Sequence, residues 1–73
     1  MIRKGTVVKL SRKGLRNDPG GKHIVFRVED ARGGKVLMRS IPVGSVWLVT
    51  LSEVVRVTSA ETLRWARAQR RTE

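Results

Sequence analysis

The chain has 73 residues, no cysteine, sixteen Lys and Arg against six Asp and Glu, and a formal net charge of +10 at pH 7. A chain of this length supports one small core, and the absence of cysteine excludes disulfides and thiolate metal sites. The charge favours a polyanionic partner, with nucleic acid ahead of an anionic membrane or an acidic protein.

No membrane or export segment is expected. The N-terminal residues 1–5 contain no apolar stretch like that of a secretory signal peptide. The longest apolar run, residues 45–51, is far shorter than the ~20 residues of a membrane span. We therefore expect a cytoplasmic protein that can associate with the nucleoid or the ribosome.

Five segments have the β-branched and alternating composition of strands: residues 5–10, 23–30, 35–41, 46–51 and 54–57. A long polar loop, residues 11–22, separates the first two, and its Asp18-Pro19-Gly20-Gly21 run is a turn signal. The alternation predicts that these side chains face the core: Ile24, Phe26, Val28, Val36 and Met38.

The second and third strands are predicted to form a hairpin. Arg39 should face solvent, because burying an unpaired guanidinium is very costly. With Phe26 facing inward, matching both faces requires an odd number of loop residues. We therefore predict a three-residue loop, Ala31-Arg32-Gly33, with Glu29 opposite Lys35. A two-residue turn would direct Arg39 inward.

The fourth strand contains Trp47. If Val46 and Leu48 point into the core, then Trp47 and Val49 point outward. An exposed Trp beside arginines could stack on a base or insert into a minor groove. Burial of Trp47 at a subunit interface or under the terminal helix is the alternative that we favour.

The C-terminal segment is predicted to be helical from Ala60 to Arg71. Thr58-Ser59-Ala60-Glu61 has the spacing of a capping box, with Thr58 as N-cap and Ser59 as the alternative. Leu63 and Ala66, with Trp65 as a further candidate, are placed to contact the sheet, while arginines crowd the last turns.

The strand order, the long first loop and the phrase from Val49 to Val57 resemble SH3-like and KOW-type small barrels, which bind nucleic acids. The resemblance covers residues 3–58. It implies a mainly β fold: a five-stranded SH3-like small barrel (residues 1–58) with a short C-terminal α-helix and basic tail (residues 59–73) in the same domain.

A second, local resemblance involves residues 42–49. Pro42-Val43-Gly44-Ser45-Val46 is similar to the Pro-Gly-Ser-Val segment of the small type II dihydrofolate reductases, which are tetramers. In that family the strand continues with Gln-Ile-Tyr, which bind cofactor and substrate. Trp47, Leu48 and Val49 stand there in this chain, so we do not expect that activity.

No catalytic or metal-binding constellation is evident. His23 is the one histidine of the sequence, so no His cluster or Ser/His/Asp triad can be assembled. Glu29 and Asp30 are adjacent and should lie on opposite faces of a strand. We therefore expect a protein that is not an enzyme and that needs no metal or cofactor.

These observations predict a small nucleic-acid-binding protein, with DNA ahead of RNA, that neutralises phosphates of double-stranded DNA with little sequence specificity. The alternative is a protein-interaction module that docks on an acidic partner, and the third is an oligomer like the type II reductases. Membrane docking is not expected, because the helix lacks a broad apolar stripe. Self-association into a homo-oligomer would help so small a core. The predicted contact residues are basic or aromatic: Lys9, Arg12, Lys13, Arg27, Arg32, Arg39, Trp47, Arg64, Arg67, Arg70 and Arg71.

Overall fold

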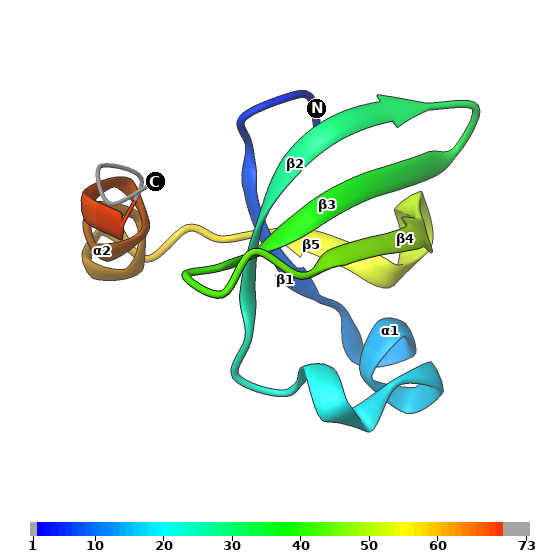
Figure 1. The fold of residues 1–73 in the computed structure, drawn as a ribbon. Coiled ribbons are helices and arrows are strands. Elements are labelled where there is room, and N and C mark those ends of the chain that lie inside the picture. The colour runs from blue at the N-terminus through cyan, green and yellow to red at the C-terminus, as the bar shows by residue number, and fades with distance from the viewer. Residues whose placement is uncertain (1, 70–73) are drawn as a thin grey trace.

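Antiparallel strands form one bent sheet in the order β4-β3-β2-β1-β5 in the computed structural model, which describes residues 2–69 (Figure 1). The elements are, in chain order, β1 Val7–Leu10, α1 Arg12–Asn17, the 3₁₀ turn η1 Pro19–Gly21, β2 Val25–Arg32, β3 Lys35–Ile41, β4 Val46–Thr50, the 3₁₀ turn η2 Leu51–Glu53, β5 Val54–Arg56 and α2 Ala60–Gln69. The predicted mainly β class with a C-terminal helix is confirmed. β4 and β5 are the two edge strands. They do not pair with each other, so the sheet is not closed into a barrel.

The first loop is more ordered than predicted, because residues 11–22 contain α1 and η1. Ser11 caps α1 by accepting a hydrogen bond from the main-chain nitrogen of Gly14 at 3.2 Å. Gly14 is buried against η2, where a Cβ would overlap the carbonyl oxygen of Glu53. The helix therefore forms where a tertiary contact favours it, although Gly is a poor helix former.

Glu53 connects α1 to the end of β4. Its Oε2 accepts a hydrogen bond from Asn17 Nδ2, and its Oε1 accepts from the main-chain nitrogen and Oγ1 of Thr50, each at 2.8 Å. These bonds, first that of Asn17 and then those of Thr50, lower the pKa of Glu53 from 4.5 to about 2, with a further contribution from the nearby Lys13.

Glu53→Gln is expected to flatten the pH dependence of stability between pH 4.5 and about 2. Because the folded pKa lies below the ordinary value, the ionised carboxylate stabilises the fold above pH 4.5, and this stabilisation is lost as the pH falls through that window. The side chain is partly exposed, so solvent screening keeps the effect small. Thermal melting of both proteins across the window measures it, and parallel curves would contradict the assignment.

The β2–β3 hairpin has the predicted faces but not the predicted loop. Phe26 is buried and Arg39 is exposed, as expected. The turn, however, is the two-residue Gly33-Gly34, and Arg32 rather than Glu29 is opposite Lys35. Both glycines have positive φ, 58° and 76°, which a tight primed turn requires.

A β-bulge in β2 explains how a two-residue turn is compatible with Phe26 facing the core and Arg39 facing solvent. Val28 is opposite Met38, but the next pair is Asp30 with Leu37, so Glu29 is the extra residue. The extra residue shifts the alternation by one position. The parity argument that excluded a two-residue turn was therefore wrong, because it assumed an uninterrupted ladder.

The main core lies on the concave face of the sheet. Its buried members come from all strands except β4: Val8, Leu10, Phe26, Val28, Val36, Met38 and Val54. Trp47 of β4 packs against this core, edge-on to Phe26 with ring centroids 5.0 Å apart.

The predicted faces of β4 are therefore reversed. Val46 and Leu48 are 54% and 65% exposed, whereas Trp47 and Val49 pack against the core. The strand is apolar at four successive positions, so alternation carries no information about its faces. The register of β4 against β3 determines which side chains face the core, because it places Trp47 opposite the buried Met38.

The N-cap of helix α2 is Ser59, one residue after Thr58, the N-cap that the sequence favoured. Ser59 is the cap, since its Oγ accepts a hydrogen bond from the main-chain nitrogen of Thr62 at 3.2 Å, so the alternative is confirmed and Thr58 is not the cap. Leu63 and Ala66 pack as predicted, and Trp65 is 41% exposed. Leu63 and Ala66 belong to a second, smaller core on the outer face of the sheet, together with Val7, Ile41, Val57 and the adjacent Val25.

Candidate nucleic-acid interface

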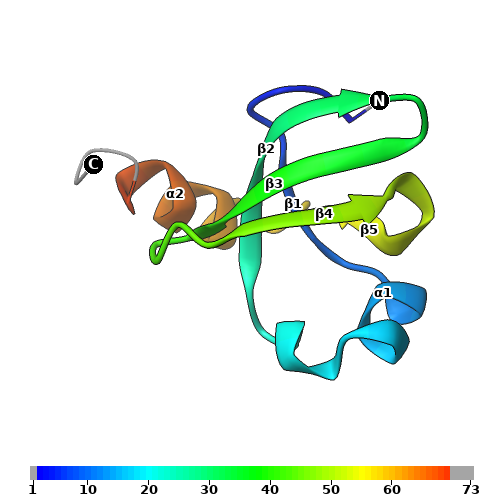
Figure 2. The same cartoon turned by 45° about the vertical axis from the view of Figure 1, so that its right-hand side comes forward.

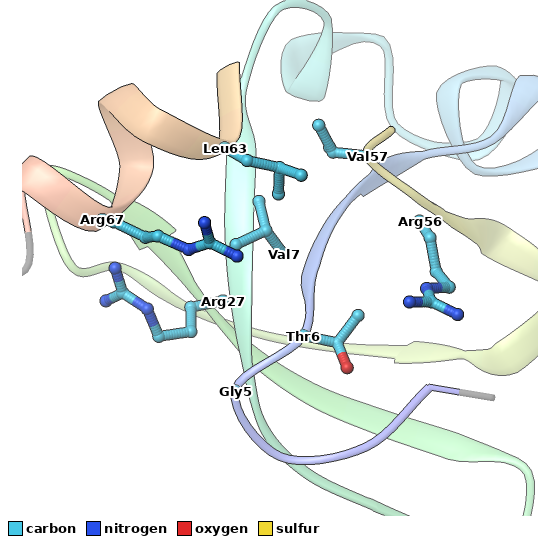
Figure 3. Close-up of a pocket in the computed structure, with 8 residues that line it drawn as sticks. All are labelled: Gly5, Thr6, Val7, Arg27, Arg56, Val57, Leu63 and Arg67. Atoms are coloured by element: carbon cyan, nitrogen blue, oxygen red, sulfur yellow. The ribbon is translucent and has the colours of Figure 1, made fainter. Parts of the chain in front are cut away.

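A pocket of about 200 Å³ lies where α2 meets the sheet, beside the second core (Figure 3). Eight residues line it: Gly5, Thr6, Val7, Arg27, Arg56, Val57, Leu63 and Arg67. Three of these are arginines and none is acidic. We call Arg27, Arg56 and Arg67 the arginine cluster.

Three separate elements bring the arginine cluster together. β1 is hydrogen-bonded between β2 and β5, with Val7 opposite Arg27 and Val8 opposite Arg56. The docking of α2 through Leu63 and Ala66 adds Arg67, one residue after Ala66. Arg27 and Arg67 lie close to each other from β2 and α2, and Arg56 lies across β1, near Thr6 (Figure 3).

Arg27 has a structural role as well. Its Nη2 donates a part-buried hydrogen bond of 2.9 Å to the carbonyl oxygen of Ala66, near the C-terminal end of α2. A cation at this position also complements the helix dipole. At Arg27 the outer sheet face is therefore covered by α2, and this predicted contact residue is only partly exposed.

Arg56 and Arg67 have neither an ion-pair partner nor a hydrogen-bond acceptor among residues 2–69. Two carboxylates pair with other arginines: Asp30 is 3.0 Å from Arg32, and Glu29 is 3.8 Å from Arg39. None of the eight residues that line the pocket is acidic, so Arg56 and Arg67 give it a positive potential, and planar guanidinium groups suit the oxygens of a phosphate.

The other predicted contact residues are scattered over the surface. Lys9, Arg12, Lys13 and Arg64 are exposed on β1, α1 and α2, and Lys13 donates to Ser52 Oγ at 3.1 Å. α1 lies away from α2 in both views of the fold (Figures 1 and 2), so its cations do not join the arginine cluster. Arg70 and Arg71 lie outside the described residues.

Three predicted residues have other partners. Arg32 and Arg39 form the ion pairs with Asp30 and Glu29, and Arg39 Nη1 also donates to the carbonyl oxygen of Gly44 at 3.1 Å. Trp47 packs on Phe26 rather than presenting an open face for stacking, and it packs against the main core rather than α2.

Sequence reasoning missed Arg56 and the pocket-lining Thr6. The signal for Arg56 was present, because a lone cation within the apolar stretch from Val54 to Val57 must be directed to solvent. Its proximity to Arg27 and Arg67 had no sequence signal, since these three positions are far apart in the chain.

No protein-family model matches the chain, and neither the curated proteins nor the solved structures contain a significant match. Within residues 2–69 no three His, Cys, Asp or Glu side chains are grouped so that they could hold a metal ion. The helices in this part of the chain are all too short or too polar to cross a bilayer.

Proposed function

We propose that this protein binds nucleic acid, double-stranded DNA in the first place, through its phosphates, with the arginine cluster as the anchor. The observation that carries the proposal is a pocket whose lining, within residues 2–69, has three arginines and no carboxylate, in a chain of net charge +10. Phosphate contacts position a protein on a duplex but do not read bases. The inward packing of Trp47 is in keeping with binding of low sequence specificity.

The supporting energetics are those of counterion release. Each phosphate that is neutralised changes the slope of log affinity against log salt by about −0.9, so about four phosphate contacts correspond to a slope near −3.6. Arg56 and Arg67 are exposed and have no competing acceptor among residues 2–69, so both guanidinium groups are available to such a ligand.

The double variant Arg56→Gln/Arg67→Gln is expected to weaken binding to a duplex DNA oligonucleotide and to reduce the salt slope by about 1.8, the share of two phosphate contacts. Its stability should be nearly unchanged, because exposed arginines without partners contribute little. Fluorescence anisotropy at several salt concentrations measures affinity and slope, and thermal melting measures stability.

The matched control is Arg12→Gln/Arg16→Gln, which removes the same charge from α1. It should retain most of the salt slope. Equal losses in both variants would show that net charge alone drives binding and would remove the role of the pocket. The absence of salt-dependent binding to duplex DNA, single strands and structured RNA would overturn the proposed function. Tight binding to polyaspartate instead would favour the acidic-partner alternative.

A further inference from the structure

Along the free edge of β4, a few main-chain groups have no hydrogen-bond partner within residues 2–69. We call the two residues that carry them, Val46 and Leu48, the window. The nitrogen of Ser40 donates to the oxygen of Ser45 at 2.8 Å, and the nitrogen of Leu51 donates to the oxygen of Gly34 at 2.7 Å. Because the ladder alternates in an antiparallel pair, the main-chain groups of residues 45, 47, 49 and 51 face β3. Those of Val46 and Leu48 face away from the sheet.

On both sides of the window, main-chain nitrogens already donate hydrogen bonds within the chain. The nitrogen of Gly44 donates to the oxygen of Ser40 at 2.9 Å. The nitrogen of Thr50 also faces outward, but it donates to Glu53 Oε1 at 2.8 Å. The N–H and C=O groups of Val46 and Leu48 thus form a compact set of two donors and two acceptors.

The chain carries no charge along this edge, and the two residues of the window are apolar. From Ser40 to Ser52 the chain has no Asp, Glu, Lys or Arg, although charged residues make up 30% of the sequence. Val46 and Leu48 are 54% and 65% exposed, and Leu37 lies opposite Leu48 on β3. Edge strands are commonly protected by a charge, a proline or a bulge, and β4 has none of these between Val46 and Thr50.

We propose that β4 pairs with β4 of a second copy of this chain, antiparallel and about a twofold axis at Trp47. This register places Val46 opposite Leu48 of the second copy, and the reverse, so that the two outward-facing residues of each chain exchange four hydrogen bonds. On the outer face, each exposed Val46 side chain would contact a Leu48 side chain across the new ladder.

Several observations favour a second copy over an unrelated strand. The window is self-complementary, so a twofold axis satisfies every group in it and the assembly closes as a dimer. A register shifted to pair Val46 with Thr50 would need the Thr50 nitrogen, which Glu53 already occupies. Two chains of charge +10 repel each other, and residues 40–52, which contain β4, add no charge of their own to that repulsion.

The first test is residue-resolved amide hydrogen exchange by NMR at low and high protein concentration, with the mass in solution from analytical ultracentrifugation. We expect the mass to approach twice that of one chain at high concentration, and added salt to favour the dimer by screening repulsion. The amides of Val46 and Leu48 should become protected only in the dimer. Those of Trp47 and Val49, which face β3, should be protected at both concentrations.

The second test is Leu48→Lys, with Val55→Lys as the matched control on the other edge strand. Both side chains are exposed, so both variants should fold. Leu48→Lys places a charge at the interface and should weaken dimerisation about tenfold or more, whereas Val55→Lys should leave it close to wild type. Stronger weakening by Val55→Lys would assign the interface to β5 and overturn the proposal.

The measurements on the wild-type protein test the proposed dimer even if Leu48→Lys does not fold. A mass of one chain at every concentration would overturn the proposal. A dimer in which the Val46 and Leu48 amides exchange at the monomer rate would overturn it equally, because the two copies would then meet elsewhere.

Discussion

Trp47→Ala is expected to lower the free energy of unfolding by about 3 kcal/mol, the low end of the range for a Phe or Trp truncation because the side chain is only partly buried. The truncation removes the edge-on contact with Phe26 and opens a void at the side of the main core. For a domain of this size the melting temperature should fall by roughly 12 °C or more. Thermal or urea denaturation measures the change.

Trp47→Phe is the control, because it keeps an aromatic ring against Phe26 and should cost much less. Below its melting transition, Trp47→Ala should bind duplex DNA as tightly as the wild type, since Trp47 lies outside the arginine cluster. A variant that keeps its stability and loses DNA binding would instead support base stacking by Trp47, the role that the sequence analysis weighed against burial.

Arg27→Ala is expected to destabilise the protein by about 2 kcal/mol, which is typical of a hydrogen bond from a charged group. The substitution leaves the carbonyl oxygen of Ala66 without the Arg27 guanidinium and loosens the attachment of α2 to the outer sheet face. Because α2 carries Arg67 to the pocket, DNA binding should also weaken. Urea denaturation and anisotropy titration measure the two effects.

Arg39→Ala is the matched control on the neighbouring strand. Arg39 lies directly opposite Arg27 but is exposed, with a hydrogen bond to Gly44 and a distant contact to Glu29 at 3.8 Å. Its removal should change stability by well under 1 kcal/mol, as is usual for exposed ionic contacts. Equal destabilisation by both substitutions would show that the Ala66 contact does not hold α2 in place.

The β2–β3 hairpin shows how far sequence reasoning extends. The faces of Phe26 and Arg39 were predicted correctly, because alternation of apolar and charged residues is a local property. The loop length was wrong because the bulge at Glu29 left no signal in the composition. The pair Gly33-Gly34 is itself typical of a two-residue turn, but this turn was rejected because the ladder was assumed to be uninterrupted.

For the candidate site, the sequence identified the type of residue but not the place. It named Arg27 and Arg67 among eleven candidates and passed over Arg56, and it did not group these three arginines at one place. Strand pairing and helix docking bring three of the arginines to one pocket and leave Arg32 and Arg39 beside carboxylates. Which cations have acidic neighbours depends on register, and register is a long-range property.

The sequence by itself determined the net charge, the mainly β class, the approximate strands and the terminal helix, because each depends on composition or on the period of contiguous residues. The tertiary structure alone decided the inward direction of Trp47, the order in the first loop and the convergence of the arginine cluster. Each of these depends on contacts between distant segments: Trp47 with Phe26, Gly14 with Glu53, and α2 with the outer sheet face. Such contacts are selected by packing of the whole core, which no local pattern encodes.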